Sequence, residues 1–523
     1  MRNETIRRIE FLIGILLSLI AVAFISIRAT HAGGLWRDEC DSVATATMPT
    51  FSELLHYFQF DSFPLPFALV LRGYVAVAGN NDTSMRVFGA LVGLSLLLIG
   101  WWYARRLRTG APLIFLAFAV LNPTFLIWGT TVRGYGLGCV IIVFALAATA
   151  NFLADRTTRN AFLMAIAFVA AVQCLVSNTA LVFAICLGGI SACFFRSDRK
   201  TALIIAGALG VAALSYSPYL ATYSKMGWHI LLQTNASLAA LWDTFRDSLG
   251  AHNPAAAIAW IALPLIAAIP WILWTTRDAS SLSIFAPFTA LFSLAGGFIF
   301  LYWLSYTPQN WYFLPLICLL AGALELTIAA FAGSAVVRII RLLVCLIAVA
   351  GTSWSSWPSL ITRQSNVDLI ANWLGSNAEG HDLIIVNPWY FGVSFNRYYH
   401  GVAPWLTVPL LSDLRIHRYD LLREKMSEED PLQEIRPTIE ETLRNGGRIY
   451  LAGGAKLLEE NERAIELPPA PRSQYGWNYL PYVVAWSQEL GKFLQAHVQH
   501  SAELPQLGAE ENIPLWEVEG WHD

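Results

Sequence analysis

The sequence predicts a polytopic α-helical membrane protein with a soluble α/β domain at its C-terminus. Of its 523 residues, 56% are hydrophobic and only 14% are charged, whereas soluble domains carry about a quarter charged residues. Repeated apolar runs of roughly 17–24 residues are long enough to cross the ~30 Å hydrocarbon layer as helices. Beyond about residue 360 these runs stop, and short apolar stretches alternate with polar ones.

The apolar runs predict about eleven transmembrane helices. The first follows the charged segment MRNETIRRIE and could be taken for a secretory signal that ends at THA, near residue 32. Its length and the spans that follow favour an uncleaved helix. The full set is 11–28, 86–104, 111–128, 133–153, 160–176, 178–195, 201–218, 255–275, 282–305, 311–332 and 336–354.

One further apolar stretch, 63–79, is predicted to be a juxtamembrane helix on the outer face. Arg72 in its middle and the prolines Pro64 and Pro66 favour an interfacial position over a span. With this assignment every basic loop falls on the cytoplasmic side, as the positive-inside rule requires. Those loops are 104–110, 154–160, 196–200, 275–281 and 336–341.

The same topology places most other polar segments outside. They are the loop 29–85, the turn 130–135, the loop 219–254, the turn 305–312 and the tail. We therefore expect an integral plasma (inner) membrane protein in which 1–358 form the membrane domain and 359–523 form a periplasmic α/β domain. Strands are predicted at 382–387, 448–452 and 514–518.

Several function classes find no support in the sequence. The net charge of −3 argues against nucleic acid as a partner. The tail has neither GxGxxG nor GxxxxGK[ST], so no nucleotide-phosphate loop is expected. Six of the seven cysteines lie in apolar runs and no CxxC occurs, which indicates small hydrophobic side chains and no disulfide framework. Glu325 is the one acid well inside a predicted span, and no partner for it is visible.

Candidate catalytic carboxylates follow the first span, in the sequence WRDE and shortly after it. Asp38 and Glu39 form an acidic pair there, and Asp61 precedes the juxtamembrane helix. Carboxylates at a water–lipid boundary can deprotonate a hydroxyl or hold a divalent cation. The alternative is a hydrated loop that simply keeps its acids outside. No cofactor is identified, and a cation held by Asp38 and Glu39 is left open.

Candidate phosphate-binding residues lie in two other outer segments. Arg133 and Tyr135 occupy the short turn TTVRGY, and Lys225 and Arg246 (with His229 between them) lie in the loop 219–254. An arginine can grip a phosphate bidentately while its stem stays in the apolar layer. Simple interfacial snorkelling is the alternative. Carboxylates and cations on one face would suit a lipid-phosphate substrate.

The order of these motifs resembles the glycosyltransferase-C superfamily, which includes protein O-mannosyltransferases and bacterial lipid A aminoarabinose transferases. The resemblance covers most of residues 1–335, and the tail matches only in kind. The chain departs from the family pattern at Phe63–Pro66, Thr130–Thr131 and Asn310–Trp311, so a metal-free mechanism stays open. The matching motifs are Trp36–Glu39, Asp61–Pro64, Arg86, Arg105–Arg106, Arg133–Tyr135 and Tyr312–Pro315.

The resemblance implies a glycosyltransferase that moves a hexosyl or pentosyl group from a polyprenyl-phosphate donor to a hydroxyl on the outer face. The acceptor would be an envelope glycan, a lipid or a protein, and membrane lipids would surround the enzyme. Asp38 would act as the base, Asp61 would position the acceptor or a cation, and Arg133 would stabilise the departing phosphate. The alternatives are a transporter, a polysaccharide ligase or polymerase with lipid-diphosphate donors, and a non-catalytic scaffold.

Overall fold

The computed structural model describes the whole chain except residues 1, 62, 274–280, 330–333, 457–461, 463–464 and 523. It divides into two compact units. The first comprises 1–31, 63–221 and 235–361; the second comprises 32–62, 222–234 and 362–523. Two segments that the sequence analysis assigned to the membrane domain, 32–62 and 222–234, therefore fold with the tail.

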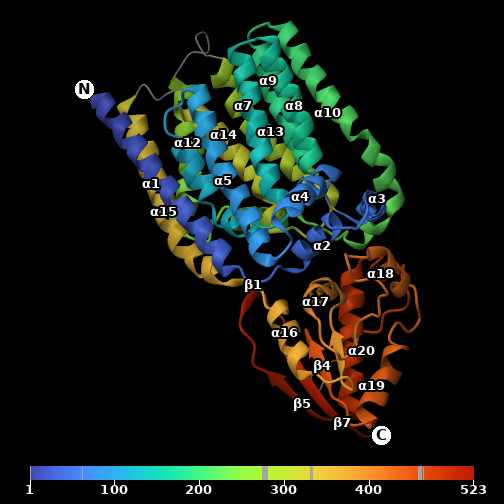
Figure 1. Cartoon of the computed structure of the whole chain (residues 1–523). Helices are drawn as coiled ribbons and strands as arrows, with labels where there is room; N and C mark the ends of the chain where they lie inside the picture. The colour runs from blue at the N-terminus through green and yellow to red at the C-terminus, as the bar shows by residue number, and fades with distance from the viewer. Residues whose placement is uncertain are drawn as a thin grey trace. The chain divides into compact units, whose positions relative to one another are not determined.

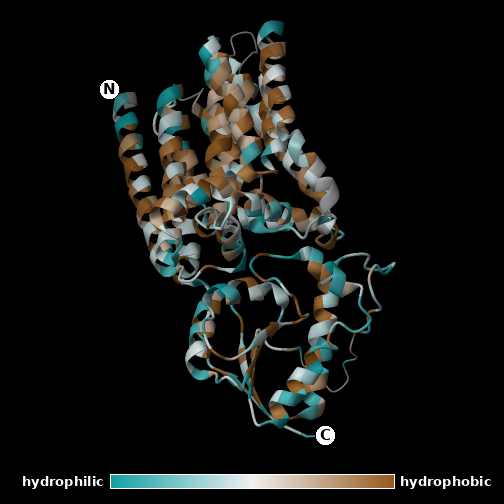
Figure 2. Ribbon diagram, turned by 45° about the vertical axis from the view of Figure 1, so that its right-hand side comes forward, coloured by the Kyte–Doolittle hydropathy of each residue, from teal (hydrophilic) through white to brown (hydrophobic). Residues whose placement is uncertain are grey.

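The first unit is a bundle of long apolar helices (Figure 1). Hydrophobic residues run along these helices and hydrophilic ones gather toward their ends (Figure 2). Among the described residues, seven helices are long and apolar enough to span a membrane. They are α1 (Arg2–His31), α5 (Asp82–Leu107), α7 (Gly134–Ala154), α10 (Arg199–Met226), α13 (Ser281–Leu304), α14 (Leu314–Ala329) and α15 (Ala335–Ile361).

Shorter apolar helices complete the set. They are α4 (Leu65–Ala78), α8 (Thr158–Cys174), α9 (Asn178–Phe194) and α12 (Pro254–Leu273). The predicted juxtamembrane helix corresponds to α4, whose 14 residues extend only about 21 Å and fall short of the ~30 Å hydrocarbon layer. The polytopic helical fold is confirmed, and within the described residues each predicted span except the third corresponds to one long helix, which for 311–332 is preceded by a 3₁₀ turn.

The third predicted span, 111–128, is a broken helix. Asn122 Oδ1 accepts a hydrogen bond from the Phe125 amide (3.1 Å), so it caps a new helical segment whose first residue, Pro123, needs no amide partner. Asn122 Nδ2 also donates to the Ser248 carbonyl (3.1 Å) at the end of α11 (Leu238–Ser248). The pieces of the broken span are α6 (Leu113–Phe115) and the π-helical turns η2 (Leu116–Val120) and η3 (Phe125–Gly129).

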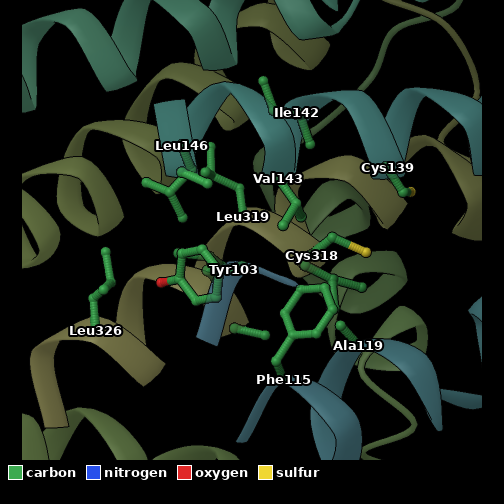
Figure 3. Packing of buried hydrophobic residues seen from close by; sticks show 14 of the residues in the cluster. Tyr103, Phe115, Ala119, Cys139, Ile142, Val143, Leu146, Cys318, Leu319 and Leu326 are labelled. Atoms are coloured by element: carbon green, nitrogen blue, oxygen red, sulfur yellow. The ribbon is translucent and has the colours of Figure 1, made fainter. Parts of the chain in front are cut away.

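The core of the bundle is filled by side chains from several helices (Figure 3). Phe115 of the broken span fits against Gly100 of α5, where a Cβ atom would collide with its ring. Tyr103 is fully buried and donates its hydroxyl hydrogen to the Gly322 carbonyl of α14 (2.6 Å). All seven cysteines are free and buried, and the burial of the six in apolar helices agrees with their predicted role as small hydrophobic residues.

Glu325 has the partner that the sequence did not reveal. Its carboxylate forms an ion pair with Arg341 of α15 (3.0 Å) and accepts a hydrogen bond from the Ile114 amide (2.8 Å). Arg341 also binds Glu10 of α1 (2.6 Å), and Glu10 pairs with Arg338. A lone buried charge is costly, so each of these charges has a partner of opposite sign. The resulting network joins α1, α14, α15 and the broken span.

The second unit is an α/β fold. Its main sheet has the strand order β3-β2-β4-β7-β5, in which β2 is parallel to β3 and β4, while β7 is antiparallel to β4 and β5. A separate parallel pair joins β1 and β6. The strands are β1 (Arg363–Ser365), β2 (Leu383–Val386), β3 (Trp405–Thr407), β4 (Ile449–Ala452), β5 (Val498–Leu504), β6 (Ala509–Glu511) and β7 (Leu515–Trp521).

Helices cover both faces of this sheet. Alternate strand residues point to opposite sides: Ile384 and Tyr450 pack with α16 and α17, whereas Ile385 and Leu451 pack with α19 and α20. The three strands predicted in the tail correspond to β2, β4 and β7, so the soluble α/β domain is confirmed. The helices of the tail are α16 (Val367–Asn377), η7 (Trp389–Phe391), α17 (Gly392–Tyr398), α18 (Tyr419–Met426), α19 (Ile435–Arg444) and α20 (Tyr479–His497).

Candidate functional site

The segment 32–62, which contains WRDE, starts beside β1 of the second unit. The Gln364 amide donates to the Ala32 carbonyl (2.7 Å), and the Leu35 amide donates to the Tyr398 hydroxyl (2.6 Å). Gly33 has a φ of +64°, a conformation that favours glycine. The segment then forms α2 (Arg37–Ala46), α3 (Phe51–Tyr57) and η1 (Phe58–Phe60).

The acidic residues of α2 differ in what surrounds them. Glu39 is fully buried, and its carboxylate accepts a hydrogen bond from the Trp36 amide (3.2 Å) at the start of the helix. Asp41 is buried and accepts from the His417 amide (2.8 Å). Asp38 keeps 23% of its side chain exposed and has one carboxylate oxygen 3.4 Å from His417 Nε2. Of these three acids, Asp38 is the one that solvent reaches.

Arg37 is enclosed by acidic and aromatic side chains. Its guanidinium forms an ion pair with Glu511 of β6 and lies 3.6 Å from Asp38. It also stacks over the rings of Tyr390 (4.7 Å) and Trp36 (5.5 Å), where cation–π attraction stabilises a partly desolvated charge. Arg37 therefore attaches α2 to the tail and places a positive charge beside Asp38.

Burial and charge shift the pKa values of the groups around Asp38. Burial raises the pKa of Glu511, and the positive charge of Arg37 offsets this only in part. Burial alone would lower the pKa of Arg37, but the charges of Glu511 and Asp38 raise it overall. Burial raises the pKa of Tyr479 to about 12 and that of Tyr419 well above its ordinary value. Both phenols thus stay protonated at neutral pH and can serve as hydrogen-bond donors.

Asp61 ends η1 and is buried (3% exposed). The preceding α3 is held through Tyr57, whose hydroxyl donates to Asp413 (3.2 Å) and whose ring lies beneath the Arg415 guanidinium (4.7 Å). Arg418 pairs with Asp413 as well (2.9 Å). This cluster fixes the end of the segment that carries Asp61 to the second unit.

Arg133 belongs to the first unit and is buried (7% exposed) directly before α7. Its guanidinium lies over the Phe63 ring, 4.6 Å from the centroid. A Cβ atom on Gly134 would lie 2.5 Å from Phe63 Cδ1, so glycine is needed for this close approach. The sequence Arg133-Gly134 therefore places an arginine against an aromatic face in an apolar environment, where its attraction to an anion is strengthened.

A series of aromatic ring contacts continues from Arg133 within the first unit. The centroid of the Tyr135 ring lies 5.2 Å from that of Phe63 and 6.1 Å from that of Tyr312. Trp311 packs against Trp128 at 4.5 Å. Both Trp311 and Tyr312 come from η6 (Asn310–Phe313), which leads directly into α14. The turn with Arg133 and the motif at Tyr312, far apart in the sequence, are thus brought together.

The two other predicted phosphate-binding residues are placed differently. Arg246 is 53% exposed on α11 and lies 3.8 Å from both Asp243 and Asp247. These acids compensate its charge, so its local environment is that of a surface ion pair. Lys225 falls near the end of α10, and its side chain lies outside the described residues.

The structure brings Asp38, Glu39 and Asp61 into the second unit, and Arg133, Tyr135 and Arg246 into the first. In the described ranges, no group of three His, Cys, Asp or Glu side chains is arranged to hold a metal ion. Asp38 and Glu39 engage different partners, His417 and the Trp36 amide. A divalent cation bound by Asp38 and Glu39 therefore remains a prediction, and the reaction proposed for this protein does not use one.

Sequence reasoning missed the tail residues that surround Asp38. His417, Tyr419 and Glu511 lie hundreds of positions away from WRDE, in stretches without a recognisable motif. Trp128 and Trp311 were also missed as neighbours of the R-x-Y turn. For these aromatic neighbours the one available signal in the sequence was the motif at Tyr312, which matched the family pattern but did not reveal which rings it contacts.

The apolar helices, the α/β unit and the WRDE helix together define a polytopic membrane protein of the glycosyltransferase-C fold. The chain is similar to ArnT from Cupriavidus metallidurans, whose crystal structure contains undecaprenyl phosphate; the TM-score is 0.50 and the identity 11%. The similarity covers 84% of this chain and 92% of ArnT, and it confirms the predicted fold. No protein-family model and no curated protein sequence matches the chain.

Proposed function

We propose that the protein is an integral membrane glycosyltransferase that moves a sugar from a polyprenyl-phosphate donor to a hydroxyl acceptor. The observation that carries the proposal is the solvent-reached carboxylate of Asp38, at the start of a helix in the first polar loop of a chain with the ArnT fold. The bound undecaprenyl phosphate belongs to ArnT. By analogy, a polyprenyl monophosphate is the donor chemistry that we assign to this chain.

The proposed reaction is a single displacement at the anomeric carbon. Asp38 takes the proton of the acceptor hydroxyl while the oxygen of that hydroxyl bonds to the anomeric carbon. The bond between the anomeric carbon and the phosphate oxygen breaks, and the lipid phosphate leaves with the electron pair. Because the acceptor attacks opposite the leaving group, the configuration inverts.

Arg133 is assigned to the departing phosphate. Its positive charge is held against Phe63 in a buried environment, where a fixed cation stabilises developing negative charge more strongly than it would in water. Tyr135 lies beside the same ring. Asp61 is assigned to the acceptor side, and Lys225 and Arg246 to secondary contacts with phosphate.

We also propose that transfer takes place on the periplasmic face of the inner membrane. Basic residues gather in the loops 104–110, 154–160 and 196–200, which the positive-inside rule assigns to the cytoplasm. The second unit, with Asp38, would then lie outside. A periplasmic acceptor could be an envelope glycan, a lipid or a protein, and the sugar could be a hexose or a pentose.

The test is a transfer assay with purified protein in nanodiscs, using radiolabelled polyprenyl-monophosphate sugars and envelope extract as the acceptor. We expect transfer from one donor, and we expect Asp38→Asn to reduce it at least about 100-fold, the usual contribution of a general base. The matched control is Asp155→Asn, because Asp155 is an exposed aspartate that follows α7.

Other outcomes would overturn the proposal. Transfer only from lipid-diphosphate donors would identify a ligase or polymerase. If a folded protein transferred from no donor with varied acceptors, the transporter class would be favoured. Full activity of Asp38→Asn would disprove the assigned base.

A further inference from the structure

We infer that His417, a residue of the tail, is a positioning residue that orients the Asp38 carboxylate for proton transfer. The inference rests on the proposed function, since it assigns a second residue to the same reaction. His417 is 7% exposed and lies between β3 and α18, outside every motif of the sequence analysis. Both residues belong to the second unit.

His417 contacts α2 at two points. Its backbone amide donates to Asp41 Oδ1 (2.8 Å), and its ring nitrogen Nε2 lies 3.4 Å from Asp38 Oδ1. Asp38 and Asp41 are three positions apart in one helix, so they lie on the same face. The contact with Asp41 therefore fixes the backbone of His417 at the point from which its ring reaches Asp38.

Aromatic side chains hold the imidazole ring in place. The Trp389 ring meets it edge-on, with centroids 5.7 Å apart and an interplanar angle of 89°. The centroid of the Tyr419 ring lies 6.1 Å from that of the imidazole. These two rings restrict the imidazole to a position in which Nε2 stays 3.4 Å from Asp38 Oδ1.

Both ring nitrogens of His417 are buried, and among the described residues neither makes a hydrogen bond. Of the two neutral tautomers, only the one with hydrogen on Nε2 can donate to Asp38. Nε2 lies 3.4 Å from Asp38 Oδ1, which is close but outside the geometry of an ordinary hydrogen bond. Such contacts often tighten when substrate binds, and donation to Asp38 would then remove the cost of an unpaired buried N–H group.

The consequence for the reaction concerns the two carboxylate oxygens of Asp38. With Oδ1 bound by His417, Oδ2 is assigned to the acceptor hydroxyl. The hydroxyl proton moves to Oδ2 as its oxygen bonds to the anomeric carbon, and the lipid phosphate leaves. His417 thus fixes which oxygen is the base without itself touching the substrate.

Other charged and titratable groups surround the pair and enter any pH dependence. From α2 they are Arg37 and Asp41, from β6 Glu511, from α18 Tyr419, and from α20 Tyr479. Arg37 lies near Asp38 as well, but it is engaged by Glu511 and by the stacked rings. A test must therefore separate the effect of His417 from that of Arg37.

The first measurement needs no activity. In the full-length protein with ¹⁵N-labelled histidine, the Nε2 resonance of His417 is compared by NMR before and after Asp38→Asn. We expect this resonance to move in the variant, because a carboxylate 3.4 Å from Nε2 is replaced by a neutral amide. His500, an exposed histidine of the same unit, is the control, and its resonances should stay in place. An unchanged Nε2 resonance of His417 would overturn the pairing.

The second measurement is the transfer assay with His417→Ala and His417→Gln. We expect His417→Ala to lower kcat about 10- to 100-fold, the worth of one hydrogen bond to a charged group, with the KM for the donor unchanged. The glutamine side chain keeps an N–H donor near the position of Nε2 and should restore most of kcat. In an Asp38→Asn background, His417→Ala should have little further effect.

These results separate the two proposals. If the wild-type protein transfers no sugar while the Nε2 resonance of His417 moves in Asp38→Asn, the pairing stands and the proposed function fails. If transfer occurs but His417→Gln is as impaired as His417→Ala, or the effects of His417→Ala and Asp38→Asn multiply, His417 does not act through Asp38. A loss of folding in both variants, read by thermal unfolding, would show a purely structural role.

Discussion

Two clusters of charged residues in this molecule are built on opposite principles. In the bundle, Glu10, Glu325, Arg338 and Arg341 match two negative charges with two positive ones, and their side chains are only 0–8% exposed. On α2, Glu39 and Asp41 are buried, while Asp38 remains 23% exposed, with contacts of 3.4 Å and 3.6 Å. The first cluster is closed, whereas the second leaves one carboxylate accessible.

The difference shows what separates a structural charge cluster from a reactive one. A buried acid whose lone pairs are all occupied cannot accept a substrate proton without losing an ion pair. An acid that solvent reaches can do so at little cost to the fold. Glu325, the acid that stands out in the sequence because it lies inside a span, belongs to the first kind. Asp38 belongs to the second.

The largest expected effect is on stability, in the closed cluster. Arg341→Met leaves Glu325 and Glu10 partly uncompensated in the bundle, and removing one partner of a buried ion pair costs about 3–5 kcal/mol. Thermal unfolding of the protein in detergent measures the loss. Arg106→Met, at an exposed arginine near the end of α5, is the matched control and should unfold like the wild type. Equal stability of the two variants would show that the network is not structural.

A smaller effect is expected from the cluster that anchors 32–62 to the tail. Partial burial alone would raise the pKa of Asp413, but hydrogen bonds and charge from Arg415, joined by Arg418, lower it from 3.8 to about 2. A lowered carboxyl pKa adds stability above the unfolded value and loses it as the pH falls from about 4 to 2. We expect a loss of about 1–2 kcal/mol in that window.

Hydrogen exchange of residues 32–62 as a function of pH measures this anchoring. In Asp413→Asn the pH dependence between 4 and 2 should weaken, because the group that titrates has been removed. An exchange profile with the same pH dependence in both proteins would assign the acid sensitivity to another group.

The smallest effect on stability is expected where the effect on activity is greatest. Asp38→Asn should change the free energy of unfolding by no more than about 1 kcal/mol, since partly exposed ion pairs contribute little. The same variant should lose transfer activity. A destabilisation as large as that of Arg341→Met would place Asp38 among the structural charges and remove the contrast between the clusters.

Much of the fold could be predicted from the sequence because it depends on local properties. Apolar runs such as 133–153 and 201–218 predict helices by length and composition alone, and α7 and α10 confirm them. The strands β2 and β4 also follow from short apolar runs between turns. The break at Asn122-Pro123 carried a local signal, a capping residue followed by proline, but the apolar residues around it suggested a continuous span.

The sequence indicated only those residues of the candidate site that stand in short local motifs. Sequence order indicated Asp38 and Arg133, since each stands in a short motif at the end of an apolar segment. Which residues surround them depends on contacts between distant positions, such as the one between Asp38 and His417. Nothing in a single sequence links these positions, because their pairing results from how the tail packs.

The sequence by itself thus determined that this is a membrane protein, where its helical spans lie and that its first loop is acidic. These features depend on the hydrophobicity and charge of individual residues. Only the tertiary structure decided that the loop with Asp38 folds with the tail, and that Glu325 is neutralised by Arg341. Both results depend on burial. A charge placed out of water needs a partner, and the chain supplies that partner from wherever packing brings it.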